Sequence, residues 1–452
     1  MHSMAARLLR GRVLLRSFSS YANGASVPEV LKPGELMPGI TTEEIALRRK
    51  KLMSSLPHGS LVILNAATVK YMTDVVPYPF RQSSDYLYFT GCREPGSIAV
   101  IYNLGDLCMF MPDPNPETAL WEGKLAHASE AISNLKASRA YNMSDLPKIL
   151  PRLLKQAKSI YAEDEIPSGG SLDKLPAYKE AIQEKKVHSV HRYAYECRFI
   201  KSPAEINLMR HAAKITSEAF IETMKISRTA KHEHVLSATV DFNCKFRGAQ
   251  RLAFPPVVAA GVNTTVIHYF RNDQQIREGD MVLMEAGCEY YGYVSDITRT
   301  WSPWGKLSNS QKDVYNAVLA AYKESIKMYK PGVTLGEVQR VSNDVLVRAT
   351  RGLGIVKKRD DYLKVNPTAV GRYLGLDCLD CKLIHEDRKL VPGVVCTIEP
   401  GLYIPLSDNF PKWFQGIGIR ISDEVLITES GHEVLSSSIP KELNEVESLL
   451  QS

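Results

Sequence analysis

The amino-acid sequence predicts a smaller α/β domain followed by a larger α+β domain. The chain has 452 residues, whereas a typical domain has roughly 100–200. Short apolar runs alternate with helical segments over residues 41–190, and long amphipathic helices are interspersed with hairpin-like strands over residues 195–448. We therefore expect two folded domains with these bounds, preceded by a leader over residues 1–24 and a linker over residues 25–40.

The composition and charge exclude several classes of protein. Hydrophobic residues make up 44% of the chain and charged residues 23%, which is ordinary for a folded domain and excludes a disordered chain. No run approaches 18 consecutive apolar residues, so we expect no membrane span. The net charge is +6, but four of these charges are arginines of the leader. The remainder is too small to indicate a nucleic-acid partner.

The eight cysteines predict reduced thiols in an intracellular compartment, because they are sparse in a chain long enough to build its own cores. Only Cys378 and Cys381 form a C-x-x-C pair. We interpret them as incidental thiols, since no second pair completes a zinc site and no thioredoxin-like βαβ pattern surrounds them.

Residues 1–24 have the composition of a mitochondrial or plastid transit peptide. They lack Asp and Glu, are rich in Ser, Ala and Leu, and carry four arginines, Arg7, Arg10, Arg12 and Arg16. The apolar run at 13–15 is too short for a secretory signal. We expect a mitochondrial location and cleavage ahead of Ser19; the alternative is a disordered basic tail that carries no address.

The predicted α/β domain begins with a helix over residues 41–53, where Thr41 and Glu44 form a capping-box pattern. Short apolar runs bounded by Gly, Pro or Asn predict strands. These runs are Ser60–Leu64, Tyr86–Phe89, Ser97–Tyr102 and Asp106–Met111. Helices are expected at residues 125–137 and 144–158.

The predicted α+β domain begins with a long helix, whose start is marked by the N-cap Ser202, Pro203 in the first turn and the capping-box acid Glu205. Further amphipathic segments predict helices over residues 232–246, 309–329 and 334–352. Strand-rich segments are expected over residues 256–270, 280–301, 393–405 and 416–428.

Three carboxylates stand on or beside apolar strand-like segments of this second domain. Glu285 ends one such run, Asp296 follows eleven residues later, and Glu399 occupies a similar position further along. A hairpin places the first two side by side, and buried acids are costly unless they are paired or bind a metal. The residues alone leave two interpretations open: a metal or acid/base site, or ion pairs with arginines such as Arg299 or Arg420.

A series of motifs in order along the chain narrows this choice. They are MTDVVPYPFRQ (72–82), DYLY (85–88), TG (90–91), RGAQR (247–251), VIHY (266–269), YVSDITRT (293–300), TIEPG (397–401) and QGIGIR (415–420). With these motifs, residues 38–450 resemble the aminopeptidase P family, and especially its mitochondrial intermediate-cleaving, Xaa-Pro aminopeptidase 3-like branch. The resemblance implies a creatinase-type α/β N-terminal domain and an α+β pita-bread C-terminal domain.

The resemblance also implies a metal site. The family binds two divalent ions, usually Mn²⁺, through two Asp on a hairpin, one His and two Glu, and a bridging hydroxide attacks the peptide bond after the first residue. Transferred by motif, the remnant ligand positions here are Glu285, Asp296 and Glu399. A family histidine that contacts the substrate and stabilises the transition state is retained as His268.

The other positions depart from the family pattern. Arg372, in GRYLG (371–375), replaces the histidine ligand of a family stretch reading GHYLG. Ser422 replaces the last glutamate ligand, and Leu379 replaces a further histidine of the site. Glu285 keeps the charge of the family aspartate but adds a methylene, while metal-ligand distances tolerate deviations of only about 0.2 Å.

The arginine decides how these departures are interpreted. A guanidinium donates only and stays protonated, so Arg372 cannot be a ligand. We expect it to pair with Glu285, Asp296 and Glu399 in one pocket, replacing the charge of the metals. The alternative of a rewired metal site would need ligands from His385, Cys378 or Cys381, none of which occupies a ligand position.

Two functions follow from this comparison. The first is a mitochondrial pseudo-peptidase that binds a peptide or protein N-terminus, with the two Mn²⁺ absent or weakly bound. The second is an active manganese-dependent Xaa-Pro or intermediate-cleaving aminopeptidase that trims imported mitochondrial proteins. Either could form a homodimer or pair with an intact paralogue.

Overall fold

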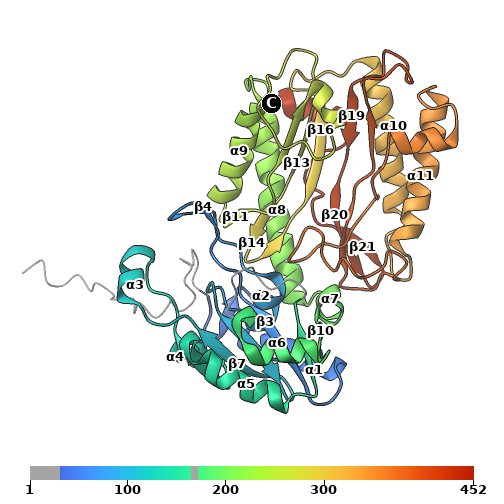
Figure 1. The fold of residues 1–452 in the computed structure, drawn as a ribbon. Coiled ribbons are helices and arrows are strands. Elements are labelled where there is room, and N and C mark those ends of the chain that lie inside the picture. The colour runs from blue at the N-terminus through green and yellow to red at the C-terminus, as the bar shows by residue number, and fades with distance from the viewer. Residues whose placement is uncertain (1–30, 164–171, 452) are drawn as a thin grey trace, which may run out of the picture. The chain divides into compact units, whose positions relative to one another are not determined.

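The computed structural model describes residues 31–163 and 172–451, and the chain divides into two units. The first unit contains His58–His188, and the second joins Glu35–Pro57 to the chain from Ser189 onward. Figure 1 shows the first unit in blue to green and most of the second in green to red. The predicted leader, and with it Ser19, lies outside the described residues.

The first unit is an α/β sandwich built on one six-stranded mixed sheet. Its strands lie in the order β10-β9-β3-β6-β7-β8. Their bounds are β3 Ser60–Asn65, β6 Ile98–Tyr102, β7 Asp106–Met111, β8 Arg139–Asn142, β9 Ser159–Ala162 and β10 Val187–Ser189. The sequence prediction of strands at the first, third and fourth apolar runs is confirmed.

Helices α2 Ser84–Thr90, α4 Ala128–Asn134, α5 Leu146–Gln156 and α6 Pro176–Gln183 flank this sheet. Helix α3 Pro116–Glu122 does not pack on it, and its Leu120 and Trp121 are largely exposed. Leu146, Leu150 and Leu154 recur every fourth residue of α5 and are buried in one core with strand residues such as Ile63 and Val100. Two of these helices, α4 and α5, are shorter than predicted at 125–137 and 144–158.

One predicted strand is wrong: residues 86–89 lie in helix α2. Every side chain of this helix is buried, and Gly91 ends it in the left-handed conformation with φ of 67°. A short run made only of apolar residues shows neither helix nor strand periodicity. The sequence pattern therefore did not distinguish a buried helix from a buried strand. A small two-stranded hairpin, β4 Tyr71–Thr73 with β5 Val76–Pro77, was also not predicted.

The boundary between the units differs from the predicted one, because residues 35–57 belong to the second unit. They form β1 Glu35–Met37, β2 Ile40–Thr41 and helix α1 Thr42–Ser55, whose N-cap Thr41 accepts the expected bond from Glu44 N at 3.3 Å. Arg48 of α1 is buried and lies 3.6 Å from Glu205 of the second unit. Arg48 also pairs with Glu44 of its own helix at 2.7 Å, and Glu44 accepts from Ser202 Oγ at 2.8 Å, so polar contacts link α1 to that unit.

The second unit has an α+β architecture. Its helices are α7 His191–Phe199, α8 Pro203–Ile226, α9 Glu233–Phe246, α10 Asn309–Ile326, α11 Leu335–Gly352 and α12 Leu443–Gln451. Figure 1 shows α8 and α9 on one side of the strands and α10 and α11 on the other. The capping box that starts α8 is formed as predicted, with Glu205 N 3.3 Å from Ser202 Oγ and Ser202 N 2.8 Å from Glu205 Oε2.

The strands of this unit form several small antiparallel sheets. Their orders are β11-β14-β15, β12-β13-β16, β17-β20-β21 and β18-β19. The bounds are β11 Arg251–Leu252, β12 Val257–Ala260, β13 Val282–Ala286, β14 Cys288–Tyr290, β15 Tyr293–Val294, β16 Ile297–Trp301, β17 Val395–Ile398, β18 Gly401–Ile404, β19 Ile417–Arg420, β20 Asp423–Thr428 and β21 Gly431–Val434. None of the helices in the described ranges is long and apolar enough to cross a membrane.

Candidate functional site

The first two acids are brought together by the pairing of β13 with β16. Glu285 of β13 lies opposite Thr298 of β16, and Asp296 directly precedes β16. Gly287 permits this arrangement, because a Cβ at that position would lie 1.7 Å from the carbonyl oxygen of Ser295. The two carboxylates that stand eleven residues apart in the sequence therefore reach the same interior, as the hairpin prediction required.

The third acid and Arg372 are placed by a backbone pairing along β17. Arg372 N donates to Thr397 Oγ1 at 3.1 Å, and Thr397 N donates to Arg372 O at 2.8 Å. Glu399 follows directly after β17. The side chains of Arg372 and Glu399 consequently lie beside each other, although 27 residues separate them in the sequence.

Arg372 contacts all three carboxylates, which confirms the predicted ion-pair pocket. Its Nη1 donates to both carboxylate oxygens of Glu399, at 2.8 and 2.9 Å. Its Nη2 donates to Asp296 Oδ2 and lies 3.5 Å from Glu285 Oε1. Its Nε donates to the backbone oxygen of Cys378 at 3.2 Å. The guanidinium is thus held in one orientation in the middle of the acids.

A second arginine completes the group. Arg420 Nη2 is ion-paired with Glu285 Oε2, while its Nε donates to Thr298 Oγ1 at 3.1 Å and its Nη1 to Tyr403 Oη at 3.2 Å. The sequence alone left open whether the acids form ion pairs with an arginine such as Arg420. The structure confirms such a pair between Arg420 and Glu285. We call Glu285, Asp296, Arg372, Glu399 and Arg420 the arginine–carboxylate cluster.

Arg299, the other arginine considered as a partner, does not join this cluster. It pairs instead with Asp423 at 2.7 Å. The reason is the alternation of side chains along β16: Thr298, opposite Glu285, points into the site, so its neighbour Arg299 points to the other face.

The cluster is buried except for Arg372, whose side chain is 27% exposed; those of its three acidic partners are 9% exposed or less. Burial raises the pKa of Glu399 to about 7, and it raises the pKa of Asp296, although Arg372 opposes both shifts. Burial by itself lowers the pKa of Arg372, but the three neighbouring carboxylates have a larger effect and raise its pKa above the usual value. The guanidinium therefore remains charged.

Some polar atoms of this pocket are left without a hydrogen bond. They include Asp296 Oδ1 and Ser422 Oγ, both buried. Ser422 lies opposite Thr298 in an isolated β-bridge, so its backbone is at the edge of the cluster while its short hydroxyl contributes no charge. Three carboxylates face two guanidiniums, which gives the cluster a formal charge of −1.

Glu424 is a member of the pocket that the sequence analysis missed. Its Oε1 accepts a bond from Asp296 N at 2.8 Å, its Oε2 is buried without a hydrogen bond, and burial raises its pKa well above the usual range. The available signal was the alternation along β20: Glu424 lies two residues after Ser422, so both side chains project from the same face.

The two remaining predicted positions lie apart from these contacts. His268 is exposed and is not part of the arginine–carboxylate cluster. Leu379 is 67% exposed on the loop after Arg372. The structure therefore brings Glu285, Asp296, Glu399, Arg372 and Ser422 together but not these two side chains.

The donor set of the pocket does not fit two divalent ions. Each acid already accepts from a guanidinium, and the group at the centre can only donate. Among residues 31–163 and 172–451, no three His, Cys, Asp or Glu side chains are arranged to hold a metal ion. Rewiring through Cys381 is not supported either, because its thiol is buried and hydrogen-bonded to Tyr195 O and Asp380.

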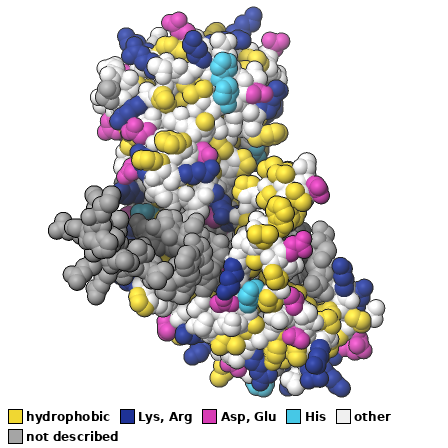
Figure 2. Space-filling view, turned by 90° about the vertical axis from the view of Figure 1, so that its left-hand side faces the viewer, with side chains coloured by type: hydrophobic (Ala, Val, Ile, Leu, Met, Phe, Trp, Pro, Cys, Tyr) yellow, Lys and Arg dark blue, Asp and Glu magenta, His cyan; other side chains and the backbone are white. Residues whose placement is uncertain are grey.

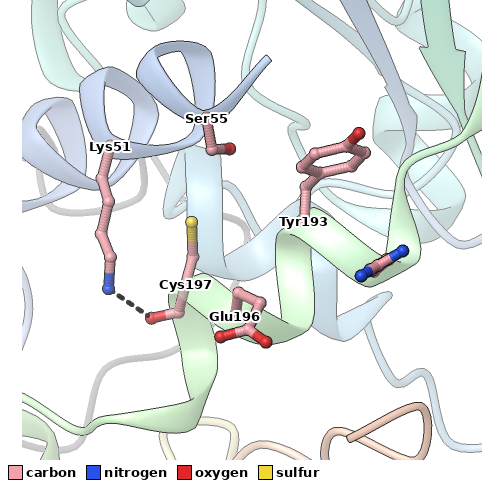
Figure 3. Close-up of a pocket in the computed structure, with 6 residues that line it drawn as sticks. Lys51, Ser55, Tyr193, Glu196 and Cys197 are labelled. Carbon is pink, nitrogen blue, oxygen red and sulfur yellow. Dashed lines mark hydrogen bonds between the residues drawn. The ribbon is translucent and has the colours of Figure 1, made fainter.

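A separate cavity of about 370 Å³ lies between α1 and α7. Figure 3 shows its lining, which consists of Lys51, Ser55, Arg192, Tyr193, Glu196 and Cys197. Lys51 Nζ donates to the backbone oxygen of Cys197 at 3.5 Å. None of the predicted site residues lines this cavity, so it is distinct from the cluster.

Two family models match the chain and define the class of protein. The first, described as Metallopeptidase family M24, matches residues 207–429. The second, described as Aminopeptidase P, N-terminal domain, matches residues 45–161. The two units of the structure therefore correspond to the two domains of a metallopeptidase, and the predicted creatinase-type and pita-bread folds are confirmed.

Individual relatives that match nearly the whole chain show which metallopeptidase family it belongs to. "Intermediate cleaving peptidase 55, mitochondrial" from Arabidopsis thaliana is 47% identical over 428 residues, covering 95% of this chain and 87% of that protein. "Xaa-Pro aminopeptidase 3" from Rattus norvegicus is 37% identical over 93% of this chain and 88% of that protein. The structure of Pseudomonas aeruginosa aminopeptidase PepP matches with a TM-score of 0.85 and 31% identity, over 91% of this chain and 98% of that one. The chain belongs to the aminopeptidase P family, which includes intermediate cleaving peptidases.

Proposed function

We propose that this chain is a pseudo-peptidase: a mitochondrial aminopeptidase P-like protein that keeps the fold but does not hydrolyse peptides. The observation that carries the proposal is the position of Arg372, whose guanidinium contacts Glu285, Asp296 and Glu399 at once. We assign these acids to the family's ligand positions, and their contacts with the arginine support the view that it takes the place of the ions.

Electrostatics argue against the arginine and two metal ions sharing the pocket. Two unit charges about 4 Å apart interact by about 4 kcal/mol at an effective dielectric constant of 20, and a divalent ion doubles this repulsion. Ser422 offers no charge in compensation. Bound manganese would polarise the peptide carbonyl and acidify a bridging water, and the donors left in this pocket do not suit that task.

The cluster is a self-consistent alternative to the metal site. Buried carboxylates that lose their counter-charge destabilise a fold by about 3–5 kcal/mol. Arg372 and Arg420 supply two positive charges to three acids and hold them through several hydrogen bonds. The protein can therefore keep a stable pocket without metal.

A binding role is consistent with the charge and exposure of what remains. Asp296 Oδ1 is left without a hydrogen bond, so it would accept one from a cation such as the α-ammonium group of a peptide. The side chain of Arg372 is partly exposed, so its guanidinium would donate a hydrogen bond to a backbone carbonyl of the ligand. His268 is the retained residue we assign to contact with the peptide.

A second function has one observation in its favour. The 47% identity to a protein named as a cleaving peptidase covers 95% of this chain. Under this alternative the protein would be an active manganese-dependent aminopeptidase that trims the N-termini of imported proteins, and Arg372 would have to leave the acids before metal could bind.

Metal analysis together with a peptide assay decides between the two. The purified chain is dialysed against excess Mn²⁺, its bound manganese is counted by mass spectrometry, and turnover of a Xaa-Pro peptide is followed. We expect less than one manganese per chain and turnover at background. Stoichiometric manganese with turnover that a chelator abolishes would refute the pseudo-peptidase and support the alternative.

The mitochondrial location is part of the proposal and has its own test. It is supported by the arginine-rich, acid-free leader and by the relative whose name includes "mitochondrial". Amino-terminal sequencing of protein purified from fractionated cells should give a start at or close to Ser19 in the mitochondrial fraction. A chain that starts at Met1 in the cytosol would contradict it.

A further inference from the structure

The cavity between α1 and α7 is lined by side chains that recur at helical spacing. Lys51 and Ser55 stand four residues apart on α1, and Arg192 and Glu196 stand four residues apart on α7. Side chains with this spacing lie on one face of a helix, so each helix turns a single face toward the cavity. Both helices belong to the second unit, and the volume of about 370 Å³ suits a small molecule.

Two cationic side chains of this lining have no acidic partner. In the described part of the chain, no acid forms an ion pair with Lys51 or Arg192. Lys51 Nζ donates to the backbone oxygen of Cys197 at 3.5 Å, which leaves donors of the ammonium group unused. The acid of the lining, Glu196, already pairs with Arg388 at 3.2 Å. The cavity therefore carries an excess of positive charge.

This excess has a local origin in both helices. On the face drawn in Figure 2, basic side chains are interspersed with acidic ones, whereas residues 48–51 of α1 are four consecutive basic residues. Arg192 is the second residue of α7, whose first turn has no side-chain cap. The unsatisfied N–H groups of a helix N-terminus add partial positive charge there. The cavity consequently favours an anion.

The two cations approach the cavity at different points along α7. Lys51 Nζ lies beside Cys197, and Arg192 comes five residues earlier. At 1.5 Å per residue this is about 7–8 Å along the helix axis, and the side chain of a helical residue leans further toward the N-terminus. Figure 3 shows Lys51 at the Cys197 end of the lining and Tyr193 toward the other end. One oxyanion would reach one cation, so a ligand that uses both needs two anionic groups.

We propose that this cavity binds a small organic dianion, with one anionic group on Lys51 and the other on Arg192. A dicarboxylate with a short aliphatic chain has this chemistry. Arginine pairs with a carboxylate through two parallel N–H groups, and the ring of Tyr193 and the thiol of Cys197 line the cavity between the two cations. The site shares no residue with the arginine–carboxylate cluster, so it is independent of the proposed function.

The first experiment titrates the full chain with adipate by isothermal calorimetry at fixed ionic strength. Malonate, acetate and inorganic phosphate are titrated in parallel. We expect one adipate per chain, bound about tenfold or more tightly than acetate or phosphate, because adipate alone pairs with both cations. Malonate is too short to reach both and should bind as weakly as acetate. Equal affinities for all four anions would overturn the proposal.

The second experiment repeats the adipate titration on charge variants. Lys51→Gln and Arg192→Gln should each weaken binding about tenfold. Since neither residue forms an ion pair, both variants should keep the circular dichroism spectrum of the unchanged chain. Lys50→Gln is the matched control, because Lys50 is an exposed lysine of α1 outside the lining, and it should bind adipate normally. Glu196→Gln should strengthen binding about two- to threefold, because it removes the negative charge.

Three further outcomes would overturn the proposal. They are a chain that does not bind adipate, binding that survives both Lys51→Gln and Arg192→Gln, and a loss in Lys50→Gln as large as in Lys51→Gln. If an acidic peptide binds through Lys51 and Arg192 while adipate does not, the cavity receives a protein segment and not a small molecule. The titrations contain no manganese and measure no peptide turnover, so their failure leaves the pseudo-peptidase untouched.

Discussion

Two buried ionic groups of the second unit differ in how well their acids are satisfied. Asp423 accepts from Arg299 and Ser436 on Oδ1, at 2.7 Å each, and from Tyr322 and Lys441 on Oδ2, at 2.6 and 2.9 Å. Although burial opposes it, these partners lower the pKa of Asp423. In the arginine–carboxylate cluster, Asp296 is equally buried, but its Oδ1 has no hydrogen bond and its pKa is raised.

The two groups therefore differ in how fully their hydrogen-bonding capacity is used. Around Asp423 every oxygen is bonded, as expected for a group that serves folding. Around Asp296 the acids outnumber the arginines, and hydrogen-bonding capacity is left over. That surplus is consistent with the pseudo-peptidase proposed above.

The largest expected effect is the restoration of the metal site. Glu285→Asp, Arg372→His and Ser422→Glu together return the family ligand set, and Leu379→His returns the further histidine. The quadruple variant should therefore bind manganese and gain Xaa-Pro peptidase activity from a background level. Metal counting and the peptide assay measure both.

Two single variants are the controls for this restoration. Arg372→His alone should stay inactive because a glutamate ligand is still missing, and Ser422→Glu alone because the arginine still occupies the centre. Activity in either single variant would show that the four positions do not act together. A folded quadruple variant without manganese would show that further positions of the pocket have changed.

The next prediction compares how much Asp423 and Asp296 contribute to the free energy of unfolding. Asp423→Asn removes the counter-charge of Arg299 and Lys441 and should lower the free energy of unfolding by about 3 kcal/mol. Asp296→Asn should lower it by about 1 kcal/mol or less, because it brings the cluster to equal numbers of acids and arginines. Urea unfolding monitored by circular dichroism gives both values; equal losses would remove the distinction between the two groups.

The pH dependence of stability tests whether the folded state lowers the pKa of Asp423. Because the folded state lowers the pKa of Asp423, its stabilising contribution is complete well above the unfolded-state pKa of about 3.9 and is lost as the pH falls through the folded pKa. The stability difference between the unchanged chain and Asp423→Asn should therefore be constant at neutral pH and shrink in acid. A difference that stays constant down to pH 3 or below would contradict the direction of the shift.

A loss as small as that of Asp296→Asn is expected for Glu285→Asp alone. The shorter side chain would draw the carboxylate back from Arg420, which it now contacts, while Arg420 keeps its bonds to Thr298 and Tyr403. The loss in unfolding free energy should be about 1 kcal/mol, without any gain in manganese binding. A loss of unfolding free energy as large as that of Asp423→Asn would mean that the ion pairs of the cluster stabilise the fold as much as those of Asp423 do.

Local features were predicted well because they depend on neighbouring residues. The capping box of Ser202 and Glu205, and the N-cap at Thr41, involve side chains three residues apart, so the residue types alone determine them. The same holds for the chemistry at the ligand positions: an arginine at 372 cannot ligate a metal in any fold.

What the tertiary structure alone decided involves partners far apart in the sequence. Arg420 rather than Arg299 meets Glu285, because strand register and side-chain alternation determine which face each arginine takes. Residues 86–89 are a fully buried helix, which their apolar run did not distinguish from a strand, and contacts of α1 with Glu205 and Ser202 place residues 35–57 in the second unit. The residue types decided that these charges had to be paired; only packing over long sequence separations decided with which partners.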